Sequence, residues 1–267
     1  MKMERIRGRV KSVLLAFAVV LVLCLWVRGC VSPGNSFRVE ADREVVRETE
    51  KMLREKYGGA FTVQKIFGRF GVRIPGGTEE WEETEMLVHP SDDETLLFEA
   101  KFLASDGDDK KKLYDEYPAA WAGKIYEKRI CEAAGDVLGE DKNWLVHVEA
   151  GSKSFPDDCF YLNNGRITPE EFTRRKPGSA WAIWVAVSGK ETEAEKERRS
   201  FFQSVAGHIR GVSEGMRGSI YFYVLGKQKL EKAGAYLKKN AKVDYGFDRI
   251  AGSPAAEIRL KRKQEGG

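Results

Sequence analysis

Two stretches decide the fold: AWAIWVAV at residues 180–187 and SIYFYVL at residues 219–225. Each is short and apolar at consecutive positions, which is typical of strands that a sheet buries on both faces. The segment between them, 191–212, has the apolar spacing of a long amphipathic helix. Its apolar stripe is formed by Phe202, Val205, Ala206, Ile209 and Val212. Two strands joined by such a helix predict a crossover unit, with helices covering one face of the sheet.

Shorter elements surround this unit in the second half of the chain. Alternating apolar residues at 144–148 predict a strand, and Thr168-Pro169 has the hydroxyl cap and the proline that begin a short helix. The elements expected beyond the unit are a helix at 228–239 and strands at 243–247 and 256–261. Together they predict a second α+β subdomain at residues 139–263.

The first half reads as helix, several antiparallel strands, helix. A helix at 40–57 ends at Gly58-Gly59, and a helix at 118–138 begins at Pro118. The segments expected between them are strands at 61–67, 72–74, 85–89 and 95–103 and a charged loop at 105–112. This is the first α+β subdomain, residues 40–138. The whole chain is therefore predicted to be α+β, with a mixed, largely antiparallel sheet covered by helices.

The N-terminal segment predicts attachment to a membrane. Fifteen consecutive apolar residues run from Val13 to Val27 behind a cationic leader. Every backbone group in hydrocarbon needs an internal partner, so such a run enters the bilayer as a helix. Residues 1–31 are expected to be a signal peptide or transmembrane anchor, and residues 32–39 a linker.

The charge distribution places the remainder of the chain on the outer face of the membrane. Residues 1–29 hold six cations and one anion, so this segment carries +5 and residues 30–267 carry −1 of the overall +4. Five of the cations precede the apolar run, and the positive-inside rule therefore keeps the N-terminus cytoplasmic. The folded part has no basic excess, which argues against a nucleic-acid partner.

The end of the apolar run, Val27-Arg28-Gly29-Cys30, resembles the processing site of bacterial lipoprotein precursors. The resemblance implies that Cys30 is lipidated and becomes the mature N-terminus. Two other outcomes stay open: an uncleaved single-span anchor, and a secretory signal that is removed.

A second resemblance is to small, uncharacterised exported proteins of Gram-positive bacteria. The segments that carry it are Lys56–Phe61, Leu97–Ala100 and Tyr114–Trp121. This family has no established function, so the resemblance implies export and nothing about chemistry.

Two cysteines, Cys131 and Cys159, lie in the folded part. Outside the cytoplasm they can form one disulfide, which would add roughly 3 kcal/mol of stability. Two buried thiols are the alternative.

No cofactor or metal motif is present in the sequence. The three histidines, His89, His147 and His208, do not share metal-ligand spacing on one element, so no metal site is predicted. The pair Asp158-Cys159, followed by His208, resembles cell-wall cysteine peptidases, in which a histidine activates the thiol. That resemblance implies Cys159 as nucleophile, with His208 or His147 as its base.

We therefore expect a membrane-anchored extracytoplasmic protein that binds a partner or assists assembly at the cell envelope, without catalysis. The alternative is a cell-envelope cysteine hydrolase that uses Cys159 and a histidine.

Overall fold

The computed structural model describes residues 34–73, 80–105, 108–139, 143–151, 165–189, 195–213 and 215–260. The predicted anchor at 1–31, the lipidation site Cys30 and the predicted nucleophile Cys159 lie outside these residues. No helix among the described residues is long and apolar enough to span a membrane. The anchor therefore stays a prediction from the sequence.

The chain divides into two compact units, residues 1–48 and residues 49–267. In the first unit, the structure describes only the beginning of helix α2 (Gly34–Tyr57), which starts inside the predicted linker 32–39. Both sheets lie in the second unit. The further split at residues 138 and 139 into subdomains stays a prediction.

The first sheet is a four-stranded antiparallel meander in the order β1-β2-β3-β4. Its strands are β1 (Phe61–Arg73), β2 (Glu80–Pro90), β3 (Phe98–Ser105) and β4 (Asp108–Asp115). The last turns of α2 bury Leu53 and Tyr57, and the rings of Tyr57, Phe61, Phe98 and Tyr117 pack together. The expected strands are present, although the first two form one long strand, β1, with two register shifts.

Strand β4 corrects the predicted charged loop at 105–112. Its sequence, DDKKKLYD, has few apolar residues, yet Phe102 pairs with Leu113 and Leu103 with Lys112 across the sheet. This strand lies at the edge of the sheet, where charged side chains discourage pairing with other molecules.

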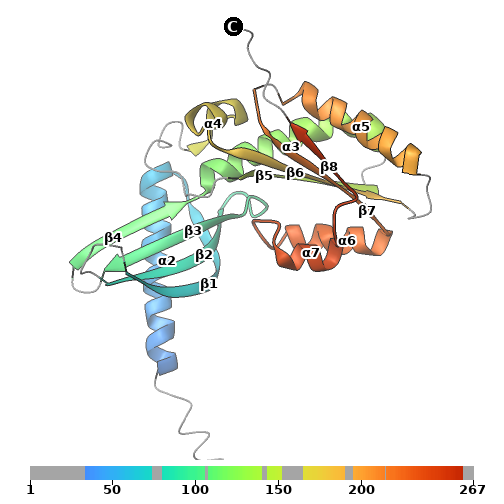
Figure 1. The fold of residues 1–267 in the computed structure, drawn as a ribbon. Helices are drawn as coiled ribbons and strands as arrows, with labels where there is room; N and C mark the ends of the chain where they lie inside the picture. The colour runs from blue at the N-terminus through green and yellow to red at the C-terminus, as the bar shows by residue number, and fades with distance from the viewer. Residues whose placement is uncertain are drawn as a thin grey trace, which may run out of the picture. The chain divides into compact units, whose positions relative to one another are not determined.

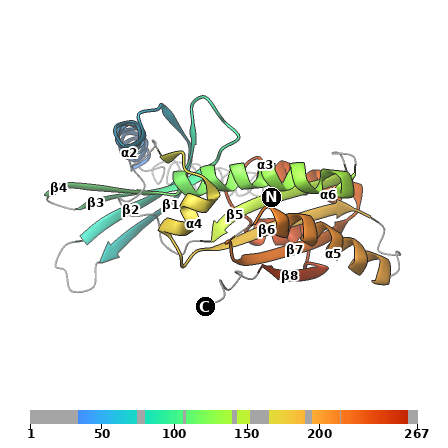
Figure 2. The same ribbon diagram turned by 90° about the horizontal axis from the view of Figure 1, so that it is seen from above.

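Helix α3 (Tyr117–Leu138) follows the first sheet and has Pro118 in its first turn, so it begins one residue before the predicted start. One side of α3 buries Ala122, Tyr126, Ile130 and Ala134. It lies along edge strand β5 (Trp144–Gly151), as Figure 2 shows. The carbonyl oxygen of Val148 is 3.0 Å from the position that a Cβ atom on Gly123 would occupy. A glycine at this place lets the helix approach the strand closely and cover its edge.

The second sheet has the order β5-β6-β7-β8, with β6 (Ala180–Ser188), β7 (Gly218–Leu225) and β8 (Ala256–Leu260). Strands β6 and β7 are parallel, joined through α5 (Glu195–Gly211), and the other two pairs are antiparallel. The crossover unit is thereby confirmed. Gly218 is required in it, because a Cβ atom there would lie 1.8 Å from the carbonyl oxygen of Trp181.

Helices cover both faces of this sheet, whereas the sequence predicted cover on one face. Figure 1 shows α3 and α5 on one side, and α6 (Lys227–Leu237) and α7 (Tyr245–Ala251) on the other. Each side has its own core: Val205 and Phe222 belong to the first, and Leu230 and Phe247 to the second. The short helix α4 (Pro169–Arg175) begins at the predicted Thr168 cap, whose side chain accepts a hydrogen bond from the Glu171 amide.

The strand predicted at 243–247 is wrong, since α7 occupies this place. The Asp244 side chain accepts hydrogen bonds from the amides of Gly246 (2.8 Å) and Phe247 (3.3 Å), which caps the helix. Phe247 and Ala251, four residues apart, are the buried positions. The capping carboxylate therefore outweighs the alternating pattern. The fold is α+β with one antiparallel and one mixed sheet.

Candidate functional site

A cavity of about 520 Å³ lies in the second unit, lined by α3, β5, the end of α6 with the loop after it, and the start of the first sheet. Six consecutive residues of β5, Leu145–Ala150, line it. The described lining combines apolar side chains with four glutamates, three lysines and two histidines. This volume is that of a small-molecule site.

Helix α3 forms one wall with a single stripe of residues. Glu116, Ala119, Ala120, Lys124 and Glu127 line the cavity, at the three- and four-residue spacing of one helical face. The stripe shares only Ala119 with the apolar stripe of α3 that enters the core. Helix α3 is therefore built to contribute to the core and to the cavity at once.

His147 lies at the centre of a carboxylate pair. Its Nδ1 is 3.5 Å from Glu127 Oε2 on α3, and its Nε2 is 3.1 Å from Glu149 Oε1 on the same strand. Burial acts to lower the pKa of His147, but the hydrogen bonds and charges of Glu127 and Glu149 outweigh it and raise that pKa to about 9. The imidazole is thus a cation at neutral pH. Its ring also contacts that of Trp184 on β6, at 5.8 Å between centroids.

Lys242, in the loop between α6 and α7, joins a second carboxylate pair. Its Nζ is 2.7 Å from Glu99 Oε2 and 2.9 Å from Glu116 Oε2. Burial and the neighbouring charges of Glu99 and Glu149 raise the pKa of Glu116, although Lys242 acts to lower it. The next residue, Val243, donates its amide to Glu149 Oε1, so the Lys242 and His147 pairs are neighbours.

Lys124 forms a third pair at another part of the wall. Its Nζ lies 2.5 Å from Asp93 Oδ2 and donates to Thr95 Oγ1 at 2.7 Å. Burial acts to raise the pKa of Asp93, but the bonds from Lys124 and Thr95 and the Lys124 charge lower it overall. This pair ties α3 to the loop between β2 and β3.

His89, at the end of β2, also lines the cavity and is 8% exposed. Its Nδ1 is 2.8 Å from the carbonyl oxygen of Pro90. A carbonyl oxygen only accepts, so Nδ1 carries the proton of this bond. Among the residues that the structure describes, Nε2 has no hydrogen-bond partner.

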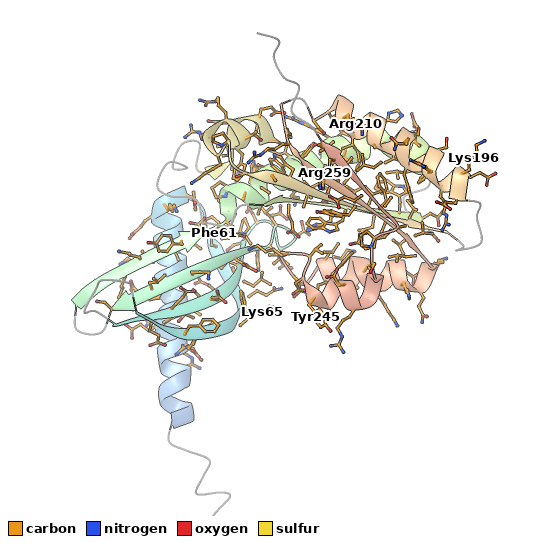
Figure 3. The ribbon with its side chains drawn as sticks, in the orientation of Figure 1. Phe61, Lys65, Lys196, Arg210, Tyr245 and Arg259 are labelled. Carbon is orange, nitrogen blue, oxygen red and sulfur yellow. The ribbon has the colours of Figure 1, made fainter. Side chains whose placement is uncertain are left out.

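The structure places the histidines of the sequence predictions in different surroundings. His147 lies in the cavity, whereas His208 is exposed in the last turn of α5. Figure 3 labels Lys196 and Arg210, which mark the two ends of that helix. Because Cys159 lies outside the described residues, its pairing with either histidine stays a prediction.

The predicted disulfide between Cys131 and Cys159 also stays a prediction. Cys131 is half-buried on α3 and packs against the core of the second sheet, and Cys159 is outside the described residues. Among the described residues, no group of three His, Cys, Asp or Glu side chains could hold a metal ion.

Sequence reasoning missed Glu116, Glu127, Glu149 and Lys242 as residues of a site. One signal was present: His147 and Glu149 alternate with apolar Val146 and Val148 on a strand of a sheet whose two faces are covered. Polar side chains on a covered face mark a site with a polar function.

Comparisons with known proteins add a likeness of fold. No protein-family model matches the chain, and no curated protein sequence matches it. A crystal structure of a DUF5037 family protein from Ruminococcus gnavus matches with a TM-score of 0.55 and 16% sequence identity. The match covers 80% of this chain and 90% of that chain. At this identity, the likeness shows a common fold alone.

Proposed function

We propose that this protein is a membrane-anchored binding module of the cell envelope, with its folded part on the outer face and without catalytic activity. Residues 1–31 hold it at the membrane, and the cavity beside α3 and β5 binds its ligand. The observation that carries the binding role is the cavity itself, a volume of about 520 Å³ with charged groups converging on an apolar wall.

The arrangement of the charges supports binding over chemistry. Lys242 and His147 each lie between two carboxylates, and Lys124 lies beside Asp93. Such pairs fix side chains in place and present a rigid surface to a ligand. Neither a cysteine nor a serine is among the described residues that line the cavity.

Filling the cavity tests the binding role. Full-length protein in mild detergent is screened by thermal shift against a panel of amines, sugars, short peptides and organic acids. Ala120 lines the cavity, so Ala120→Trp is expected to abolish the stabilisation that any hit gives the wild type. Ala235→Trp, at an exposed position of α6, is the matched control and should retain it. Hits that stabilise both variants equally would contradict binding in the cavity.

Location is tested separately with the full chain in a Gram-positive host. The chain is expected in the membrane fraction, where a membrane-impermeant amine reagent labels its exposed lysines in intact cells. Recovery from the soluble cytosolic fraction, or labelling only after lysis, would refute the anchor and the outer-face location.

A further inference from the structure

The cavity contains a buried acceptor that no residue of the described part of the chain uses. His89 is 8% exposed, and its Nδ1 donates to Pro90. In the neutral imidazole, Nε2 then offers a lone pair and no proton. A buried polar atom without a partner costs free energy, which a donor from a ligand removes. The donor that fits Nε2 is an N–H or O–H group.

With His147 protonated, the four carboxylates that line the cavity are matched by four cations, but two further carboxylates, Asp93 and Glu99, pair with lysines of the lining. When these ion-pair partners are included, there are six anionic and four cationic side chains. The anions are Glu94, Glu116, Glu127, Glu149, Asp93 and Glu99, and the cations are Lys124, Lys238, Lys242 and His147. With His147 protonated, this leaves two negative charges in excess. The excess lies where four carboxylates surround only two cations: Glu99 and Glu116 at Lys242, and Glu127 and Glu149 at His147.

The excess negative charge is costly in this setting. Glu116 has Glu99 and Glu149 as repelling neighbours, and burial strengthens charge interactions because water is excluded. A positively charged ligand group would supply the missing counter-charge. A protonated amino group also carries N–H donors, which the lone pair on Nε2 of His89 or a glutamate oxygen can accept.

Apolar side chains lie beside these charges. Leu96 and Leu97, in the loop before β3, and Phe98, at the start of β3, line the cavity. Leu145 lines it from β5 and Leu237 from α6. They offer an apolar surface against which a short hydrocarbon chain can be buried away from water. The ligand therefore needs an apolar part as well as a cationic head.

We infer that the cavity binds small organic amines, in which a protonated amino group is attached to a short hydrocarbon chain. This inference rests on the proposed binding role and names its ligand class. Bare carboxylates and uncharged alcohols of the same length lack the counter-charge that the cavity requires.

The three histidines provide an internal test. In the full-length protein in mild detergent, labelled with ¹³C at the histidine Cε1 atoms, three probes of equal length are titrated: pentylamine, pentan-1-ol and pentanoate. Pentylamine is expected to shift the His89 and His147 resonances saturably and to leave exposed His208 unchanged. Its affinity is expected to exceed that of pentan-1-ol by about tenfold, and pentanoate should not bind.

Two further comparisons separate charge from hydrogen bonding. Trimethylpentylammonium keeps the charge without N–H donors, and it is expected to bind about fivefold more weakly than pentylamine. Glu149→Gln is expected to lower the affinity for pentylamine about tenfold. Glu132→Gln, on the exposed side of α3, is expected to leave this affinity unchanged.

Each contrary result has a distinct meaning. Pentan-1-ol or pentanoate binding as tightly as pentylamine, with the same histidine shifts, overturns the amine preference and leaves the binding role standing. If pentylamine shifts none of the three resonances up to its solubility limit, the amine inference is overturned. The binding role would then be decided by whether Ala120→Trp abolishes any hit from the wider panel.

Discussion

The ion pairs of His147 predict how stability depends on pH. The perturbation is a rise from pH 6.5 to pH 9.5, compared between the wild type and a His147→Gln variant. The folded-state pKa of His147 is raised to about 9 from an ordinary value of 6.5. A raised pKa means that the stabilisation is fully present below the unfolded-state pKa and is lost as pH rises through the folded-state value.

The magnitude follows from the size of the shift. One unit of pKa corresponds to about 1.4 kcal/mol, so a rise from 6.5 to about 9 corresponds to about 3 kcal/mol. The His147 side chain is 18% exposed, which keeps solvent screening small. Deprotonation removes the counter-charge of both Glu127 and Glu149 and therefore weakens the link between α3 and β5.

The assay is urea unfolding of the full-length protein in mild detergent, followed by tryptophan fluorescence at pH 6.5, 7.5, 8.5 and 9.5. The free energy of unfolding of the wild type is expected to exceed that of His147→Gln at pH 6.5. The difference should shrink by about 3 kcal/mol by pH 9.5, because groups common to both proteins cancel. A difference that stays constant, or a histidine resonance for His147 that titrates near pH 6.5, would refute the reasoning.

Three substitutions test the interactions that hold the fold together, each by urea unfolding. Gly218→Ala places a Cβ atom 1.8 Å from the Trp181 carbonyl oxygen and should cost at least about 3 kcal/mol, whereas Gly178→Ala, with open space around it, should change little. Asp115→Ala removes the buried carboxylate that binds Lys56 Nζ at 2.7 Å and should cost about 3–5 kcal/mol; a loss below 1 kcal/mol would show that this pair is not structural. Asp244→Ala removes the N-terminal cap of α7 and should cost about 1 kcal/mol, and an unchanged stability would contradict the capping role.

The crossover unit was predictable because its signals are local. AWAIWVAV and SIYFYVL are apolar on both faces, and the helix between them has one clear stripe. In the structure the two strands are parallel and adjacent, and α5 connects them along the chain. Strands covered on both faces leave this pattern in any sequence.

The errors arise where local signals compete. The edge strand β4 carries charged residues that also suit a loop, so its pairing with β3 shows only in three dimensions. At 243–247, alternation favoured a strand, and the hydrogen bonds of Asp244 favour α7 instead. In both places, the pattern of apolar and polar side chains does not by itself determine whether the backbone forms a strand, a helix or a loop.

The candidate site could not be assembled from the sequence. Glu99 and Lys242 are 143 residues apart and meet only because the loop after α6 lies beside the first sheet. Glu116, the residue before α3, and Glu127, on α3, look like ordinary surface residues until β5 and this loop are in place. Only His147 and Glu149, polar on a covered strand, gave a local sign.

The central claim is that the cavity beside α3 and β5 is where this protein binds its ligand. The most direct measurement is an experimental structure of the full-length protein with the strongest hit from the ligand panel. We predict ligand density inside the cavity, in contact with His147 or Glu149 and with the Leu237 wall. Density at another place on the molecule, with the cavity holding only water, would contradict the claim.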